Sequence, residues 1–405
     1  MEEGLVPHPV VVPEEENPMK WLNKDEVLDF GDGADHAEDE METDLKEDLL
    51  CIPSYKVEAK SNNQQQSFDR LQESDKSLVV DNDFDCVDID KQPAFEHPLM
   101  KNHKIQLSPT FAKDIKQSRP SYNGKAFKVD SFTKGCPPPK VPIHKKALRH
   151  HQMNTTSSSS KVHPEIFRES KLVAQLLTST PNTIYRGARA AISLFNLSLQ
   201  AHQYSLSQIW LESGLEDETN AIHVGFGVDG YKKTGCYNID CPGFVQVNSK
   251  IGLGTYIPER TSLVGSIDDI WDVKTHVKQD KSTGNWWLYT TNPDVLVIGY
   301  WPNEIFTHLK EGALRVYFGG ETYTPLDMDS PPMDSGRYPK QGLGSSAFMS
   351  VLGIVDSDYN ENDINLDVMR AFVSRDCYDL DHIGYWNVQF GHAFLFGGPG
   401  GKCDE

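Results

Sequence analysis

Residues 187–200 read GARAAISLFNLSLQ, a stretch in which apolar and polar residues alternate. Successive side chains of a β-strand point to opposite faces of the sheet, so this period of two predicts a strand with one buried face. The same texture recurs at residues 205–211 (SLSQIWL), 220–228 (NAIHVGFGV), 243–249 (GFVQVNS) and 313–321 (ALRVYFGGE). Many short strands separated by turns predict a mainly β fold, an antiparallel sandwich or barrel.

Two further stretches predict a hairpin and a helix. Residues 280–291 read DKSTGNWWLYTT, in which KSTG supplies a turn and the aromatic residues enter a strand. Residues 302–312 read PNEIFTHLKEG, in which Pro302 would begin a helix and Gly312 would end it.

Composition divides the chain into four parts. Residues 1–75 are acid-rich and poor in apolar residues, so they predict a disordered extension. Residues 76–145 mix aromatic, apolar and charged residues and predict a small folded module. Residues 146–165 contain a run of Ser and Thr that predicts a flexible linker. Residues 166–405 form the β domain.

The 405 residues carry a net charge of −20, from 59 acidic and 39 basic side chains. Proteins that bind nucleic acid neutralise phosphates with clustered Lys and Arg, so this balance argues against a nucleic-acid partner. No uninterrupted apolar run is long enough for a membrane span. The chain opens with Met1-Glu2-Glu3 and lacks the basic start and long apolar stretch of a secretory signal.

The seven cysteines point instead to an oxidising compartment. Six of them pair by position: Cys86 with Cys136, Cys236 with Cys241, and Cys377 with Cys403. Three disulfides, each within one module, are one interpretation, and unlinked buried thiols are the other. Spacing alone leaves both open, and Cys51 is left over in the acidic extension.

Several strings in the β half are more specific than their composition. They are DGYKKTGCYN (229–238), GFVQVNS (243–249), GNWWL (284–288), GYWP (299–302), FGGE (318–321) and FGGPGGKC (396–403). In this order they resemble the catalytic domain of the plant neprosin family. Residues 85–106, DCVDIDKQPAFEHPLMKNHKIQ, resemble the activation peptide of the same family.

The resemblance implies a specific chemistry. Neprosins are secreted glutamic endopeptidases that cleave after proline in acid, are made as zymogens and have an antiparallel β-sandwich. Two glutamates activate a water: one is ionised and accepts its proton, while the other is protonated and donates to the peptide. The resemblance therefore implies proline-containing peptides or proteins as partners, no cofactor and no metal.

Only one of the two glutamates is carried over. Glu321 matches the glutamate of the family's Gly-Gly-Glu strand end, and the glycines before it would let a substrate backbone approach closely. The family's other glutamate lies in an Ile-Glu-x-Gly-Trp strand, whereas residues 222–226 read IHVGF. His223 therefore stands at the position of the missing glutamate. A stretch that family members carry between Val228 and Asp229 is also absent.

These departures predict a catalytically impaired member, a pseudoenzyme. At acid pH His223 would be protonated and unable to act as a base, and its charge would keep Glu321 ionised and a poor acid. Two alternatives stay open. One is a non-catalytic binding module for proline-rich peptides or cell-wall glycoproteins, and the other is an active secreted peptidase whose gene model is incomplete. The family and the cysteines predict a secreted, extracellular protein.

Two asparagines and two aromatic pairs carry weaker signals. Asn154 and Asn196 begin Asn-x-Ser/Thr patterns and are candidate glycosylation acceptors in a secreted protein. The aromatic pairs at 286–287 (WW) and 300–301 (YW) can stack on proline rings or sugars, although core packing is the commoner role at strand positions.

Overall fold

The computed structural model describes residues 54–57, 84–116, 135–145, 169–178, 180–200, 203–215, 219–229, 243–255, 262, 264–266, 270–291, 294–325, 328–364, 369–374 and 376–403. All described residues belong to one compact unit, which lies within Glu47–Glu405.

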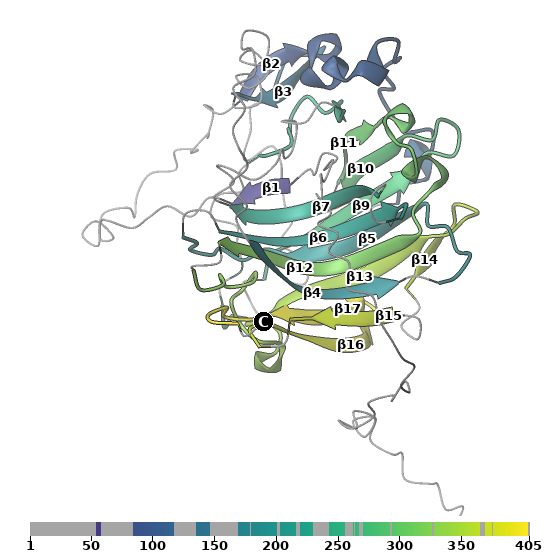
Figure 1. The fold of residues 1–405 in the computed structure, drawn as a ribbon. Helices are drawn as coiled ribbons and strands as arrows, with labels where there is room; N and C mark the ends of the chain where they lie inside the picture. The colour runs from purple at the N-terminus through teal and green to yellow at the C-terminus, as the bar shows by residue number, and fades with distance from the viewer. Residues whose placement is uncertain are drawn as a thin grey trace, which may run out of the picture. The chain divides into compact units, whose positions relative to one another are not determined.

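One sheet has six strands in the order β1-β7-β6-β12-β4-β15 (Figure 1). Its strands are β1 (Ser54–Val57), β7 (Asn220–Asp229), β6 (Tyr204–Ser213), β12 (Arg315–Pro325), β4 (Glu169–Thr178) and β15 (Met369–Val373). All neighbours are antiparallel except β1 and β7, which are parallel.

The other sheet has nine strands, eight in the order β16-β17-β13-β5-β9-β10-β11-β8 and β14 paired with β13. Its strands are β16 (Asp379–Asn387), β17 (Gly391–Gly397), β13 (Ala347–Val355), β5 (Gly187–Ser193), β9 (Asp272–Gln279), β10 (Trp286–Thr291), β11 (Val295–Trp301), β8 (Val245–Gln246) and β14 (Glu361–Asp363). The predicted turn joins β9 to β10, where Gly284 has a φ of 78°.

The core lies between the inner faces of the two sheets. The alternating residues Ile209, Leu211, Val316 and Phe318 of the six-stranded sheet are fully buried, and so are Ile192 and Val277 of the nine-stranded sheet. All belong to one apolar cluster. This confirms the predicted mainly β, antiparallel sandwich, because period-two strands bury one face each.

The predicted helix at residues 302–312 is wrong. The structure has two short 3-10 helices there, η9 (Asn303–Ile305) and η10 (Leu309–Glu311). The side-chain oxygen of Asn220 accepts hydrogen bonds from the backbone N–H groups of Thr307 at 2.8 Å and His308 at 2.7 Å. Because those donors are used by a distant residue, they do not continue a helical ladder.

The N-terminal module pairs β2 (Phe84–Asp88) with β3 (Lys140–His144). Four 3-10 helices follow β2: η2 (Ile89–Lys91), η3 (Pro93–Glu96), η4 (Pro98–Met100) and η5 (Ala112–Asp114). Prolines begin η3 and η4, since a ring without an N–H is tolerated in the first turn. Within the sandwich, a further described 3-10 helix is η11 (Pro339–Gln341).

The module contacts the β10–β11 side of the nine-stranded sheet through polar groups. Asp280 accepts hydrogen bonds from the backbone N–H and the hydroxyl of Thr110, both at 2.7 Å, and from Gln106 at 3.0 Å. His103 contacts the Tyr300 hydroxyl at 2.7 Å and the Glu304 carboxylate at 3.0 Å.

Two of the three predicted disulfides are present. Cys86–Cys136 and Cys377–Cys403 each have a Cα–Cα distance of 5.5 Å. Cys51, Cys236 and Cys241 lie outside the described residues. The first bond closes the N-terminal module, and the second ties the chain end to the segment before β16.

Four residues of the N-terminal extension, Ser54–Val57, form a strand that the sequence does not predict. The sequence predicts no strand within residues 1–75, yet β1 pairs along β7. Without it, β7 would present an open backbone edge, and an extended segment such as SYKV can cover that edge. The remaining residues up to 75 and the predicted linker at 146–165 lie outside the described part.

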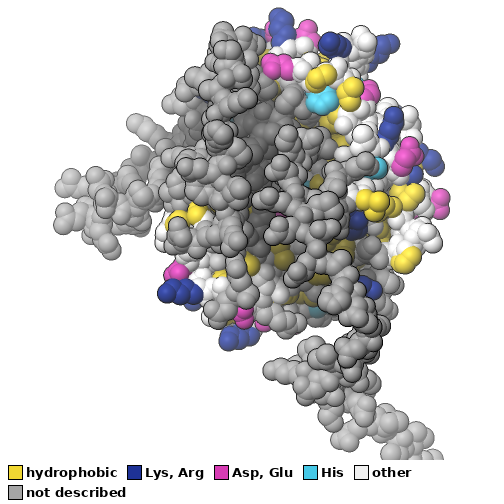
Figure 2. All heavy atoms as spheres, viewed as in Figure 1, with side chains coloured by type: hydrophobic (Ala, Val, Ile, Leu, Met, Phe, Trp, Pro, Cys, Tyr) yellow, Lys and Arg dark blue, Asp and Glu magenta, His cyan; other side chains and the backbone are white. Residues whose placement is uncertain are grey.

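Charged side chains of both signs are interspersed over the described residues in the space-filling view (Figure 2). Among the described residues, no helix is long and apolar enough to cross a membrane.

Candidate functional site

Glu321 lies on the face of the six-stranded sheet that points away from the core. Val316 and Phe318 of β12 are buried in the core, and Glu321 is an odd number of positions from Phe318 and from Val316. Side chains alternate along a strand, so Glu321 points to the opposite face, where it is half-buried.

The two glycines before Glu321 are needed for packing within the protein. A Cβ at Gly319, whose φ is 145°, would lie 2.1 Å from the backbone oxygen of Ala174 on β4. A Cβ at Gly320 would lie 2.5 Å from the sulfur of Met333. These glycines therefore allow close contacts with the neighbouring strand and the core, and their role in admitting a substrate backbone stays a prediction.

Tyr204 holds the Glu321 carboxylate. Its hydroxyl donates a hydrogen bond of 2.7 Å to Oε1 of Glu321. Tyr204 also stacks on Tyr323, with ring centroids 5.1 Å apart and an interplanar angle of 17°. Both tyrosines are buried, so the carboxylate has a fixed partner on a rigid aromatic pair.

His223 shares the face of Glu321 but not its register. His223 pairs with Trp210, and Trp210 pairs with Tyr317, which is four positions from Glu321 on β12. The backbones of His223 and Glu321 are therefore about 10 Å apart across the sheet and about 13 Å apart along it. The His223 ring also makes an edge contact with Trp210 at 5.7 Å.

Gln208 lies between these two positions. It pairs with Gly225 on β7 and with Gly319 on β12, so both neighbours lack side chains. A Cβ at Gly225 would lie 2.0 Å from the backbone oxygen of Ser207. Gln208 is only 1% exposed, and its Nε2 has no hydrogen-bond partner in the described part of the chain. A buried, unpaired donor is costly and marks a candidate ligand-binding atom.

Glu212 is a second carboxyl on the same face. It pairs opposite Arg315, six positions from Glu321 along β12, and accepts a hydrogen bond of 3.4 Å from Arg315 Nε. Burial raises the pKa of Glu212, against the charge of Arg315, and the charge of Glu321 adds to the increase. The two carboxyls therefore influence each other electrostatically.

Asp334 is a buried carboxyl beside β6, but it lies on the core side of the six-stranded sheet. It accepts a hydrogen bond from the Ser207 hydroxyl, and its backbone N–H donates to Ser205 at 3.0 Å. Burial raises the pKa of Asp334 to about 7 against the effect of Ser207. Ser205 and Ser207 alternate with Gln208, so Asp334 faces away from Glu321.

The aromatic pairs belong to the core. Trp286, Trp287, Tyr300 and Trp301 are at most 1% exposed, so a stacking role for them on a ligand has no support. Asn196 is exposed, and Asn154 lies outside the described residues. No group of three or more His, Cys, Asp or Glu among the described residues is arranged to hold a metal ion.

Sequence reasoning missed Tyr204 and Gln208. Their signal is their phase: both have even positions in β6, which places them on the face opposite the core residue Ile209. The alternation alone reads as a solvated face, because the burial of Gln208 depends on residues that are distant in sequence.

Two family models match the chain. The Neprosin model matches residues 226–399, which include Glu321 and begin three positions after His223. The Neprosin activation peptide model matches residues 81–182, which include β2, β3 and the sandwich strand β4. The module boundary at residue 145 stays a prediction. The two matches together cover the N-terminal module and most of the sandwich, and the chain belongs to the neprosin family.

Proposed function

We propose that this chain is a neprosin-type zymogen that binds proline-containing peptides on the Glu321 face and hydrolyses them poorly or not at all. The observation that carries the proposal is the residue set of that face. Glu321 is held by Tyr204, and His223 stands where the resemblance calls for a second carboxyl.

The chemistry supports impairment. Hydrolysis needs one group that accepts a proton from water and another that donates to the peptide. In acid an imidazole is protonated and cannot accept a proton from water, so position 223 supplies no base. The Gln208 amide remains able to donate a hydrogen bond to a peptide carbonyl, so binding does not require the missing group.

Retained hydrolysis is the second candidate, and one observation favours it. Glu212 lies on the same face, and burial raises its pKa, which favours the protonated form that can donate a proton. Glu321 would then be the base. Against this candidate, Glu212 is engaged by Arg315 and lies further along the strand than His223 does.

The two disulfides support an oxidising compartment, and we infer that the protein is secreted. The hydrogen bonds from Thr110 and Gln106 to Asp280 support a zymogen in which the activation peptide is docked on the sandwich.

The test is incubation of the full chain in acid with a labelled proline-containing peptide, followed by mass spectrometry and fluorescence anisotropy. We expect saturable binding without cleavage after proline. The matched variant Glu321→Gln should bind the peptide with a different affinity and, like the wild type, should not cleave it.

Cleavage after proline that disappears in Glu321→Gln would overturn the proposed impairment. If the same cleavage also disappears in Glu212→Gln, with the fold intact by circular dichroism, the second candidate is correct. Absence of both binding and cleavage would reject the peptide-binding role.

A further inference from the structure

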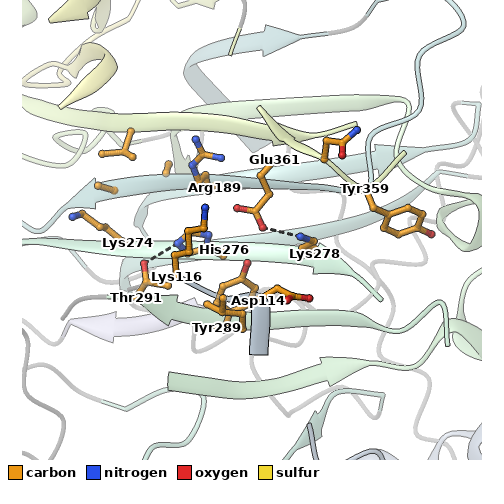
Figure 3. A pocket seen from close by; sticks show the side chains of 15 residues that line it. Asp114, Lys116, Arg189, Lys274, His276, Lys278, Tyr289, Thr291, Tyr359 and Glu361 are labelled. Carbon is orange, nitrogen blue, oxygen red and sulfur yellow. Dashed lines mark hydrogen bonds and ion pairs between the residues drawn. The ribbon is translucent and has the colours of Figure 1, made fainter. Parts of the chain in front are cut away.

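A pocket of about 580 Å³ lies on the nine-stranded sheet, on the face that points away from the core (Figure 3). Lys274, His276 and Lys278 of β9 line it, and they alternate with the core residues Val273 and Val277. The pocket is therefore on the other sheet from Glu321. Its volume is typical of a site for a small molecule.

His276 is the centre of the pocket floor. Lys274 and Lys278 are two positions away on either side, Arg189 is its partner on β5, and Tyr289 is its partner on β10. The rings of His276 and Tyr289 stack at 4.7 Å with an angle of 15°. Three cationic side chains thus surround one imidazole, as the labelled side chains in Figure 3 show.

The imidazole itself stays neutral. Burial lowers the pKa of His276 to about 3, and the charges of Arg189, Lys274 and Lys278 add to the effect against that of Glu361. One ring nitrogen, Nε2, contacts the Thr291 hydroxyl at 2.9 Å. A neutral ring adds no repulsion between cations and can offer a hydrogen bond.

The pocket gathers positive charge in a strongly acidic chain. Its charged lining residues are Lys116, Arg189, Lys274, Lys278, Asp114 and Glu361, which gives four positive and two negative charges, a net of +2 against −20 for the chain. Asp114 and Lys116 come from the activation peptide. Without these two residues the lining has three positive charges and one negative charge, so its net charge is still +2.

Two of these positive side chains donate to carboxylates beside the pocket. Glu361 accepts from Lys278 at 2.7 Å, and Asp363 accepts from one terminal nitrogen of Arg189 at 2.7 Å. A guanidinium has five N–H donors in a fixed plane, so Arg189 can bind a further oxyanion edge. Asp272, close to Lys274, has a pKa raised by burial to about 6 against the charge of Lys274.

The Arg189 side chain is held in place. A Cβ at Gly353 on β13 would lie 2.4 Å from the Arg189 Cζ, so the guanidinium lies directly against the glycine. Two other lining residues, Val351 and Tyr359, have positive φ angles of 54° and 71°. Left-handed backbone is costly for a β-branched residue and concentrates at ligand sites.

We propose that this pocket binds a small organic anion through a carboxylate, sulfate or phosphate group. Arg189 and Lys274 hold the oxyanion, and His276 contributes a neutral hydrogen bond. The ring of Tyr289 borders the body of the ligand. This inference concerns the other sheet and does not depend on peptide binding or hydrolysis at Glu321.

Isothermal titration of the full chain at constant ionic strength tests the proposal. The probes are sodium sulfate, sodium phosphate and galacturonate, with galactose as the neutral match for galacturonate. We expect saturable binding of at least one anion with a Kd below about 1 mM and none for galactose. Binding of sulfate or phosphate would show that the pocket accepts a simple oxyanion. Binding of galacturonate alone would show that it requires a carboxylate attached to a ring.

Variants assign the binding to the pocket. Arg189→Gln should weaken binding at least about tenfold, because charge-assisted hydrogen bonds are lost. Gly353→Ala keeps the charge but displaces the guanidinium, and should give a similar loss. Exposed Lys310→Gln removes the same charge elsewhere and should have no effect.

Two results would overturn the proposal. One is the absence of binding for all three anions, and the other is anion binding that Gly353→Ala and Arg189→Gln leave unchanged. If Arg189→Gln does not fold, Gly353→Ala decides the outcome.

Discussion

Single side chains on the Glu321 face differ in how completely their polar groups are satisfied. The Tyr204 hydroxyl is used by Glu321, whereas the Gln208 amide nitrogen is buried without a partner in the described part of the chain. A folded protein retains such an unpaired donor at a cost of about 1–3 kcal/mol, so it marks a position where a ligand can supply the acceptor.

Gln208→Leu should separate binding from stability. We expect peptide affinity to fall about three- to tenfold, because one hydrogen bond to the peptide is lost. The thermal midpoint should stay the same or rise, because the unpaired amide is removed. Anisotropy and calorimetry measure the two effects, and exposed Gln341→Leu is the control. Unchanged affinity would show that Gln208 does not contact the peptide.

For single residues, the sequence identifies which positions match the motifs of the family, but it does not predict how their side chains are arranged in space. It places Glu321 and His223 at family positions, but their shared face and their offset along the strands depend on the register of β6, β7 and β12. Gln208 could not be identified, because a polar residue in period-two alternation reads as exposed until its burial by distant residues is known.

At the scale of elements, strands follow from local alternation and short helices do not. The stretches at 187–200 and 313–321 contain β5 and much of β12, since the two-residue period is a local property. The predicted helix at 302–312 fails because Asn220, 87 residues before Thr307 in sequence, captures the N–H groups that a helix would use.

Asn220→Leu tests the role of this side chain in the η9–η10 segment. The N–H groups of Thr307 and His308 would lose their acceptor, so we expect a destabilisation of about 1–3 kcal/mol. Asn220→Asp keeps an acceptor oxygen and should cost less. Urea denaturation monitored by fluorescence compares the two. Equal stability of the wild type and Asn220→Leu would contradict this assignment.

At the scale of the whole molecule, two buried carboxyls, Asp334 and Asp272, make a contribution to stability that is larger in acid than at neutral pH. The pKa of Asp334 is raised by burial to about 7, well above the value of about 3.9 in an unfolded chain. A carboxyl whose pKa is higher in the folded state contributes to the stability of the fold. This contribution is fully present below the pKa of the unfolded state and is lost as pH rises through the pKa of the folded state. Asp272 acts in the same direction, with a pKa of about 6.

Asp334→Asn should therefore be nearly neutral at pH 4 and stabilising at pH 8, by at most about 4 kcal/mol. The amide keeps an acceptor for the Ser207 hydroxyl and cannot ionise. Thermal unfolding across this pH range measures the effect, with exposed Asp358→Asn as the control. A stability difference that is independent of pH would show that Asp334 does not titrate as described.

The docking of the activation peptide also belongs to this scale and could not be predicted from composition. The contacts of His103 with Tyr300 join residues 197 apart in sequence, and those of Thr110 with Asp280 join residues 170 apart. Motif likeness identified both partners, but only the folded chain shows which side chains meet.

We propose that the side chain at position 223 limits hydrolysis on the Glu321 face. Cleavage of a proline-containing peptide in acid should be compared for the wild type, His223→Glu and His223→Glu/Glu321→Gln. We expect His223→Glu to cleave at least about 100-fold faster than the wild type, and the double variant not to cleave. A wild type that cleaves as fast as His223→Glu, and only when Glu321 is present, would contradict it.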